Sequence, residues 1–353
     1  MKRGADEGAP ESDAYPGARA PRLAPHVVGH AGAQAEMLNA YRSGRLAHAW
    51  LIAGPEGIGK ATLAWAFARF VLANPDPAAP AVAQARDLFV PADHPAARQL
   101  ASHSHPDFAL LRRELNPKGK GFFTEIRIDD VRAAQGVFRM ASAFDGWRVV
   151  LVDSADDLNR AGANALLKTI EEPPPRALVL IVSHRPGQLP PTIRSRCRRL
   201  TLEPLAAGEV EEIVRSQGEP WSEARTIAEA AARSGGSARE ALRRLDPERA
   251  EMGAAIDALV AKLPGVDWRA ALRLADRFAG AAGAEAHELF VLAIYDWLAA
   301  RMRTRPTPER SEAAAELWDK LRAGAREVDA LNIDRKTHAL ALLQEIAERA
   351  RRL

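Results

Sequence analysis

The stretch AWLIAGPEGIGKATLA, residues 49–64, decides the fold of this chain. Its five apolar residues predict a buried strand, its glycines predict a turn, and residues 62–72 carry a helical pattern. Glycines let backbone N–H groups face phosphate oxygens, and the start of a helix adds partial positive charge. The spacing from Gly54 to Gly59 and Lys60 therefore predicts a phosphate-binding loop, with Lys60 reaching the outer phosphates of a nucleotide.

Two positions of this site depart from the pattern of a working ATPase. Ala61 stands where a Ser or Thr hydroxyl would hold Mg²⁺, and Thr62 lies about 100° further around the helix, which makes it a poor replacement. The apolar run 149–152 ends in Asp153, which could orient Mg²⁺, but Ser154 follows where a Glu would activate water. The residues therefore predict a site for ATP or ADP with Mg²⁺ that lacks two parts needed for hydrolysis.

Composition sets the broad class of the protein. The 353 residues suggest two or three domains, and 47% hydrophobic with 27% charged residues is an ordinary globular balance. The net charge of +3 permits contact with nucleic acid but does not argue for it. The single cysteine, Cys197, excludes a disulfide within the chain, suits a reducing cytosol, and leads us to predict no zinc. No apolar run is long enough to cross a bilayer.

The pattern along the chain changes near residue 204. Residues 1–25 are rich in Gly, Ala, Pro and acids and are predicted to be a disordered tail. Residues 26–203 alternate short apolar strands with helices, which predicts a parallel α/β sheet, with residues 74–105 as an insertion. The expected strands are 49–53, 108–111, 149–152, 177–183 and 198–202, and the expected helices are 33–43, 62–72, 128–141 and 161–170 with a turn near residue 192. Beyond them, we expect short helices at 206–217, 222–234 and 237–245, then long amphipathic helices at 268–278, 286–303, 311–332 and 335–353.

Four segments of the central block carry a closer resemblance. They are IRIDDVR (126–132), VDSAD (152–156), ANALLKTIEEPP (163–174) and LPPTIRSRC (189–197). This series resembles the clamp-loader family of bacterial replicative DNA polymerases, a branch of the AAA+ superfamily, over roughly residues 25–245. The resemblance implies a RecA-like AAA+ domain at 26–203, a small helical lid at 204–246 and a helical collar for oligomerisation at 247–353.

The resemblance also implies roles for single residues. Arg196, in the Ser-Arg-Cys motif, matches an arginine finger that reaches the γ-phosphate of ATP in an adjacent subunit; the alternative is a solvated basic face at 194–199. Ser183 matches a γ-phosphate sensor, against an ordinary serine at a strand end. Arg239 matches the lid arginine that reaches back to bound nucleotide, against a surface helix arginine. The complete set of expected nucleotide-binding residues is Gly54, Gly57, Gly59, Lys60, Thr62, Asp153, Ser183 and Arg239.

Within this family, one subunit type hydrolyses ATP and another is largely rigid and supplies the arginine. Ala61, Ser154 and the missing zinc cysteines favour the rigid type, which is not itself catalytic. The resemblance implies cytoplasmic partners: gamma/tau motor subunits, a delta subunit, the sliding clamp and primed DNA bound without sequence preference. Two alternatives stay open, a gamma/tau motor subunit and a nucleotide-binding scaffold outside replication. The retained loop also leaves open whether nucleotide binds or the loop only caps a helix.

Overall fold

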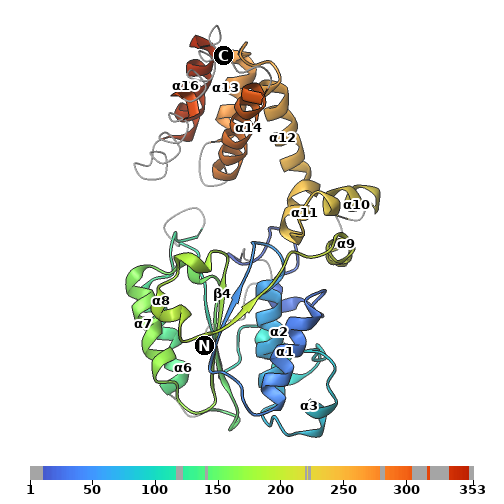
Figure 1. Cartoon of the computed structure of the whole chain (residues 1–353), viewed down its shortest axis with the longest axis vertical. Helices are drawn as coiled ribbons and strands as arrows, with labels where there is room; N and C mark the ends of the chain where they lie inside the picture. Colours follow the sequence, from blue (N-terminus) through green and yellow to red (C-terminus); the bar gives the residue numbers. More distant parts are fainter. Residues whose placement is uncertain are drawn as a thin grey trace. The chain divides into compact units, whose positions relative to one another are not determined.

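The computed structural model describes residues 11–116, 122–139, 142–218, 221, 224–278, 283–303, 316–318 and 334–349 (Figure 1). The chain forms two compact units, Met1–Leu245 and Asp246–Leu353, and each is described by itself.

A five-stranded parallel sheet is the centre of the first unit, as the alternating pattern predicts. The strand order is β2-β3-β4-β1-β5, so the strand that leads into the glycine loop lies between two neighbours. Every residue of β1 and β4 is buried, because helices cover both faces of the sheet. The strands are β1 (Ala49–Ala53), β2 (Phe108–Leu111), β3 (Arg148–Val152), β4 (Ala177–Ser183) and β5 (Arg198–Thr201).

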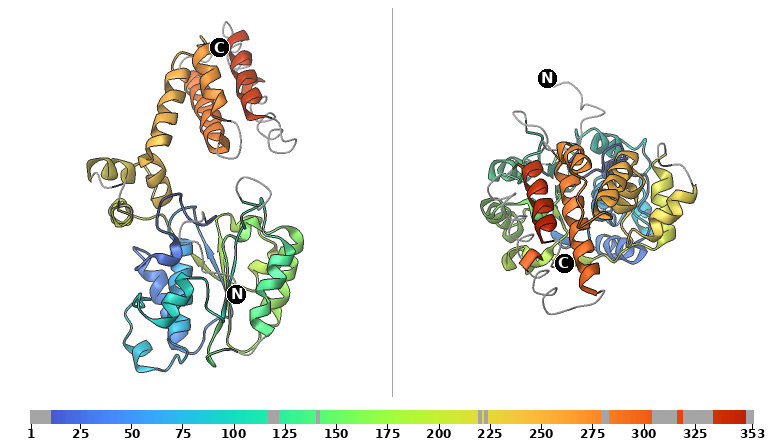
Figure 2. Two further views of the ribbon diagram at one scale, coloured as in Figure 1. Left: turned by 180° about the vertical axis from the view of Figure 1, so that it is seen from behind. Right: turned by 90° about the horizontal axis from the view of Figure 1, so that it is seen from above.

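The side chains of β1, β2, β3 and β4 alternate between two separate cores. Trp50 and Ile52 of β1 point into the core beneath α1 (Ala31–Arg42) and α2 (Lys60–Ala73). Leu51 points into the opposite core, which the remaining helices of the sheet domain cover (Figures 1 and 2). Those elements are α5 (Ile128–Ala134), α6 (Gly136–Arg139), η2 (Ala155–Asp157), α7 (Arg160–Glu171), η3 (Pro186–Gln188) and α8 (Pro191–Arg194). The single helix expected at 128–141 is therefore divided into α5 and α6.

The segments before and after the first helices have defined contacts. The insertion after α2 holds two short helices, α3 (Pro80–Gln84) and α4 (Pro95–Ala101). The expected disordered tail divides in two: residues 1–10 lie outside the described part, whereas residues 11–25 pack on the sheet domain and include the turn η1 (Pro21–Leu23). Tyr15 packs instead on the helical segment that follows the sheet, where it is buried edge-on against Trp221.

Three helices follow the sheet within the first unit, where the sequence predicts three. They are α9 (Ala207–Ser216), α10 (Ala224–Ala232) and α11 (Ala238–Leu245). Their apolar faces share one core that includes Val210, Ile227 and Leu242.

The described residues of the second unit form helices joined by turns, with no strand among them. Its helices are α12 (Pro247–Val260), α13 (Trp268–Asp276), α14 (Gly283–Arg303) and α16 (Arg335–Glu348). The amphipathic character expected of the helix at 286–303 is confirmed, since Phe290, Ile294 and Leu298 form a fully buried apolar stripe on α14. Most of the helix expected at 311–332 lies outside the described residues. Among the described helices, none combines the length and apolar character required to span a membrane.

Candidate nucleotide-binding site

The glycine loop follows β1 directly and ends at the first residue of α2. Gly54, Gly57 and Gly59 all have positive φ angles, of +147°, +78° and +100°. A Cβ atom on Gly54 would lie 2.5 Å from the carbonyl oxygen of Leu202, and one on Gly57 would lie 2.3 Å from Ser237 Oγ. Both the backbone angles and the close neighbours therefore require glycine.

Lys60 and Asp153 meet the loop from two different elements. Lys60 begins α2, is only 2% exposed, and donates a hydrogen bond from Nζ to the Pro55 carbonyl oxygen of its own loop. Burial lowers the pKa of the Lys60 ammonium to about 8, although the charges of Asp153 and Glu56 oppose this shift. Asp153 follows β3, and burial raises the pKa of its carboxyl far above the ordinary range. The negative charge of Asp13 adds to that increase, whereas Lys60 opposes it.

One cavity of about 700 Å³ brings most of the expected nucleotide residues together. This volume is in the range of small-molecule and cofactor sites. The expected residues that line it are Gly57, Gly59, Lys60, Thr62, Asp153 and Arg239. Its floor therefore combines loop backbone, an ammonium and a carboxylate, which is the chemistry that a nucleotide phosphate with Mg²⁺ requires.

Arg239 belongs to this cavity and is not a free surface arginine. It lies in the first turn of α11, and its backbone N–H donates to the Gly57 carbonyl oxygen at 3.4 Å. Its Nε lies 3.5 Å from Glu56 Oε1. Burial lowers its pKa below the ordinary value. The helical segment after the sheet thus contacts the glycine loop through a charged side chain that lines the cavity.

Ser183 lies beside the cavity, and its hydroxyl group is hydrogen-bonded to a neighbouring carboxylate. It is fully buried at the end of β4 and donates from Oγ to Asp156 Oδ1 at 3.1 Å. The same carboxylate accepts from the backbone N–H groups of His184, at 2.7 Å, and Arg185, at 2.8 Å. Val182 and His184, but not Ser183, are among the described residues that line the cavity. The sequence analysis did not identify Asp156 and His184 as residues of this site, since nothing in their spacing distinguishes them.

Arg196 lies away from its own chain's cavity. It follows α8, its side chain is 41% exposed, and its Nη2 lies 3.0 Å from Glu171 Oε1 at the end of α7. Its Nη1 donates to the Thr192 carbonyl oxygen at 3.1 Å. The neighbouring Arg198 differs, because it pairs with Glu36 at 2.9 Å and stacks over Trp50. All four arginines of the run 194–199 are exposed, and Arg196 and Arg198 each pair with a different carboxylate.

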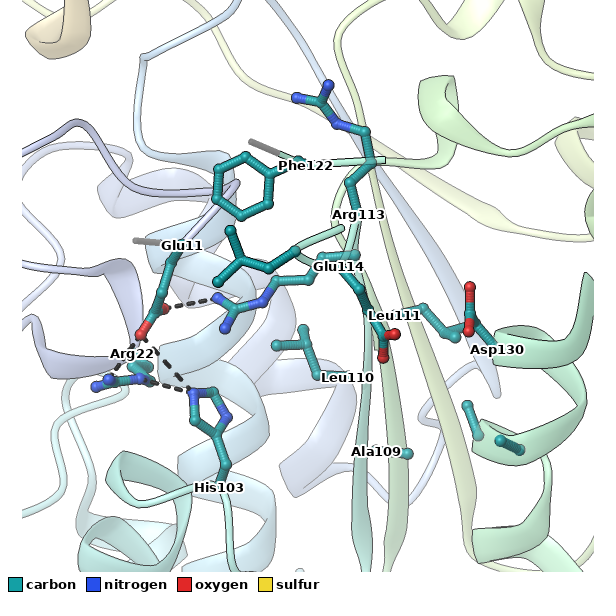
Figure 3. Close-up of a pocket in the computed structure, with 14 residues that line it drawn as sticks. Glu11, Arg22, His103, Ala109, Leu110, Leu111, Arg113, Glu114, Phe122 and Asp130 are labelled. Atoms are coloured by element: carbon teal, nitrogen blue, oxygen red, sulfur yellow. Dashed lines mark hydrogen bonds and ion pairs between the residues drawn. The ribbon is translucent and has the colours of Figure 1, made fainter. Parts of the chain in front are cut away.

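The N-terminal segment contributes side chains that sequence reasoning missed. Asp13 and Tyr15 line the nucleotide cavity, and Glu11 lines a second cavity of about 540 Å³ at the edge of β2. Figure 3 shows Glu11 in direct contact with Arg22 and His103 at this second cavity. A Gly- and Pro-rich composition gave no signal for contacts with distant segments, such as the Glu11–Arg112 pair, which joins positions 101 residues apart in the chain.

The fold and site together define a phosphate-loop protein of the AAA+ class. The parallel sheet carries the glycine loop after β1 and an acid after β3. The helical segment after the sheet contacts this loop through Arg239. Within this class, the family model described as "DNA polymerase III, delta subunit" matches residues 29–206, and the chain belongs to that family. The expected resemblance to subunits of the replicative polymerase is thereby confirmed.

Curated relatives agree with this assignment. The chain is 37% identical over 192 residues to DNA polymerase III subunit delta′ of Pseudomonas aeruginosa, covering 54% of this chain and 53% of the relative. It is 31% identical over 169 residues to delta′ of Escherichia coli K12, covering 48% and 46%. It is 27% identical over 229 residues to subunit tau of Bacillus subtilis, covering 62% and 36%. The chain thus spans about half the length of the delta′ relatives that it matches.

Proposed function

We propose that this chain is the delta′-type subunit of a DNA polymerase III clamp loader, and that it supplies Arg196 to the ATP site of a neighbouring motor subunit. The supporting observation is the position of Arg196, which is exposed and outside its own nucleotide cavity. A phosphate that another chain brings to this surface could meet the Arg196 side chain there. Its planar, permanently charged guanidinium suits a developing γ-phosphate charge.

The chain's own site supports little or no hydrolysis. Ala61 lines the cavity without a hydroxyl that could hold a metal ion. Ser154 is buried, and its hydroxyl hydrogen-bonds to Asp157, which leaves no carboxylate at that position to activate water. Binding of ATP or ADP with Mg²⁺ is nevertheless part of the proposal, because Lys60, the loop backbone and Asp153 fit a nucleotide phosphate and its cation. When bound, Mg²⁺ would neutralise phosphate charge.

The proposed working assembly contains gamma/tau motor subunits and a delta subunit, and it acts in the cytoplasm to load the sliding clamp onto primed DNA. Residues 26–203 would be the RecA-like domain, 204–246 the lid and 247–353 the collar that joins the subunits. Contact with DNA would be made by the assembled complex, through backbone phosphates and without sequence preference.

The test is ATP turnover by the reconstituted clamp loader, stimulated by clamp and primed DNA, with wild-type chain, Arg196→Ala or Arg198→Ala. Arg198 is the matched control, because it is a neighbouring exposed arginine with its own carboxylate partner. Loss of an arginine finger lowers the rate at the affected ATP site by about 10³–10⁵-fold. We expect Arg196→Ala to remove the turnover of that site while the complex still assembles on gel filtration, and Arg198→Ala to leave turnover unchanged.

Three results would contradict the proposal. Unchanged turnover with Arg196→Ala would make Arg196 a surface charge. Substantial ATP turnover by the purified chain alone would favour the motor-subunit alternative, and failure to co-purify with motor and delta subunits would favour a scaffold outside replication.

A further inference from the structure

The nucleotide cavity contains a carboxylate that the phosphate-loop pattern does not provide. Asp13 reaches the cavity from the N-terminal segment and lines it together with Lys60 and Asp153. Its side chain is only 1% exposed. Among the described residues, its Oδ1 pairs with Arg112 Nη1 at 2.5 Å, whereas its Oδ2 is buried and has no hydrogen-bond partner.

Asp153 presents a second oxygen of the same kind. The residue is 7% exposed, and its Oδ2 is also buried without a partner among the described residues. A buried carboxylate oxygen without a partner is costly, and such atoms in native proteins call for a donor or a cation. Both residues line one cavity beside the glycine loop, and a divalent cation bound between them would satisfy both oxygens. Mg²⁺ in phosphate sites is commonly held by one or two carboxylates together with phosphate oxygens and waters.

We propose that Asp13 is the second carboxylate of the Mg²⁺ site and supplies the protein oxygen that Ala61 cannot. This inference rests on the proposed binding of nucleotide with Mg²⁺, and it is independent of the role of Arg196. Arg112 holds one oxygen of Asp13 and leaves the other oxygen for the cation.

Anchoring contacts hold Asp13 in place from both sides. Glu11, two residues before it, pairs with Arg22 and Arg112 at 2.6 Å each. Tyr15, two residues after it, packs edge-on against Trp221 with ring centroids 6.4 Å apart. A ligand held by fixed neighbours loses less conformational entropy when the ion binds.

The opposite role for Asp13, an anion that occupies the phosphate position and excludes nucleotide, fits the contacts less well. A phosphate mimic would pair with the phosphate-binding ammonium, yet Lys60 Nζ donates to the Pro55 carbonyl oxygen. The partner of Asp13 is instead Arg112, which does not line this cavity.

The experiment measures binding of ADP to the full chain by calorimetry, with Mg²⁺ and with EDTA, and binding of Mn²⁺ by electron paramagnetic resonance in the presence of ADP. The variants are Asp13→Asn, Asp13→Asn with Ala61→Ser, and Asp76→Asn as the control. Asp76 caps an exposed turn of the insertion through a hydrogen bond to the Ala78 N–H and does not line the cavity.

We expect Asp13→Asn to weaken binding of ADP with Mg²⁺, and of Mn²⁺, by at least about tenfold, while binding of ADP in EDTA stays unchanged. Ala61→Ser in the same chain should restore much of the loss, because it returns a hydroxyl to the usual metal-binding position. That rescue separates metal ligation from simple unfolding of the segment.

Other outcomes would overturn the proposal in recognisable ways. Tighter ADP binding by Asp13→Asn, with and without Mg²⁺, would identify Asp13 as an excluding anion. Wild-type behaviour of Asp13→Asn would show that the cation does not use this residue. If the wild-type chain binds no ADP under either condition, the nucleotide part of the proposed function fails and this inference fails with it.

Discussion

Replacement of Glu11 by Gln tests whether the N-terminal segment is held in place by charge. Burial alone would raise the pKa of Glu11, but contacts with His103, Arg112 and Arg22 outweigh it and lower that pKa from 4.5 to about 2. Each pKa unit corresponds to about 1.4 kcal/mol, so ionised Glu11 stabilises the packed segment by roughly 3 kcal/mol at neutral pH. The side chain is only 11% exposed, so solvent screening reduces this value little.

The sign of the pH dependence follows from the lowered pKa. The stabilisation is fully present above pH 4.5 and is lost as the pH falls through about 2. Glutamine keeps the shape and one acceptor but carries no charge. At pH 7 we therefore expect Glu11→Gln to weaken the packed segment by about 2–3 kcal/mol, and at pH 3 we expect less than half of that difference.

Native-state hydrogen exchange of residues 11–25 measures the free energy of opening this segment. The amides of Ala14, Leu23 and Ala24 donate hydrogen bonds within it, and their exchange at pH 7 should be about 30–150 times faster in the variant. Glu36→Gln is the matched control, since Glu36 is 39% exposed and pairs with Arg198 on the surface. It should leave exchange of the segment unchanged. Equal exchange in wild type and Glu11→Gln at pH 7, or a difference that persists undiminished at pH 3, would refute the reasoning.

Three further changes test the loop, the thiol and the helical unit. Gly54→Ala should lower the free energy of unfolding by more than about 1 kcal/mol in urea titrations, because its Cβ would lie 2.5 Å from the Leu202 carbonyl oxygen at a φ of +147°. Gly32→Ala, with open space around it in α1, should be neutral or stabilising; a similar loss at both sites would contradict this account. Burial raises the pKa of the Cys197 thiol to about 11, so its alkylation by iodoacetamide at pH 8 should be much slower in the native chain than in urea. Equal alkylation rates in the two conditions would argue that the thiol is not buried. Phe290→Ala should destabilise the unit 246–353 by about 3–5 kcal/mol in urea unfolding, because Phe290 is fully buried, whereas a change below 1 kcal/mol would mean that the core rearranges around it.

Local sequence patterns were sufficient to predict the strands of the sheet and the glycine loop. The strand 49–53 matches β1 residue for residue, and the helix expected at 161–170 lies within α7. Hydrophobic periodicity and glycine spacing act over a few residues, so a single sequence carries them fully. The expected helix at 128–141 was too long, because the α-helix ends at Ala134 and a short second helix follows.

The site was predicted in part. The loop, Lys60 and Asp153 follow from spacing, and the structure places them around one cavity with Arg239. The expectation of a disordered N-terminus overlooked residues 11–25, whose contacts depend on Arg112 and Trp221 far along the chain. Composition describes what a segment can bury by itself and carries no information about partners that the fold brings to it.

By itself, the sequence determined that a strand, a glycine loop and a helix follow one another, and it predicted that Ala61 and Ser154 replace two groups needed for hydrolysis. Those properties are local, since they depend on which side chains stand at adjacent positions. Only the tertiary structure decided that Asp13 enters the nucleotide cavity, that Ser183 bonds to Asp156, and that Arg196 lies outside that cavity. Each of these depends on packing between distant segments, because burial and charge pairing are set by what surrounds a side chain and not by its neighbours in sequence.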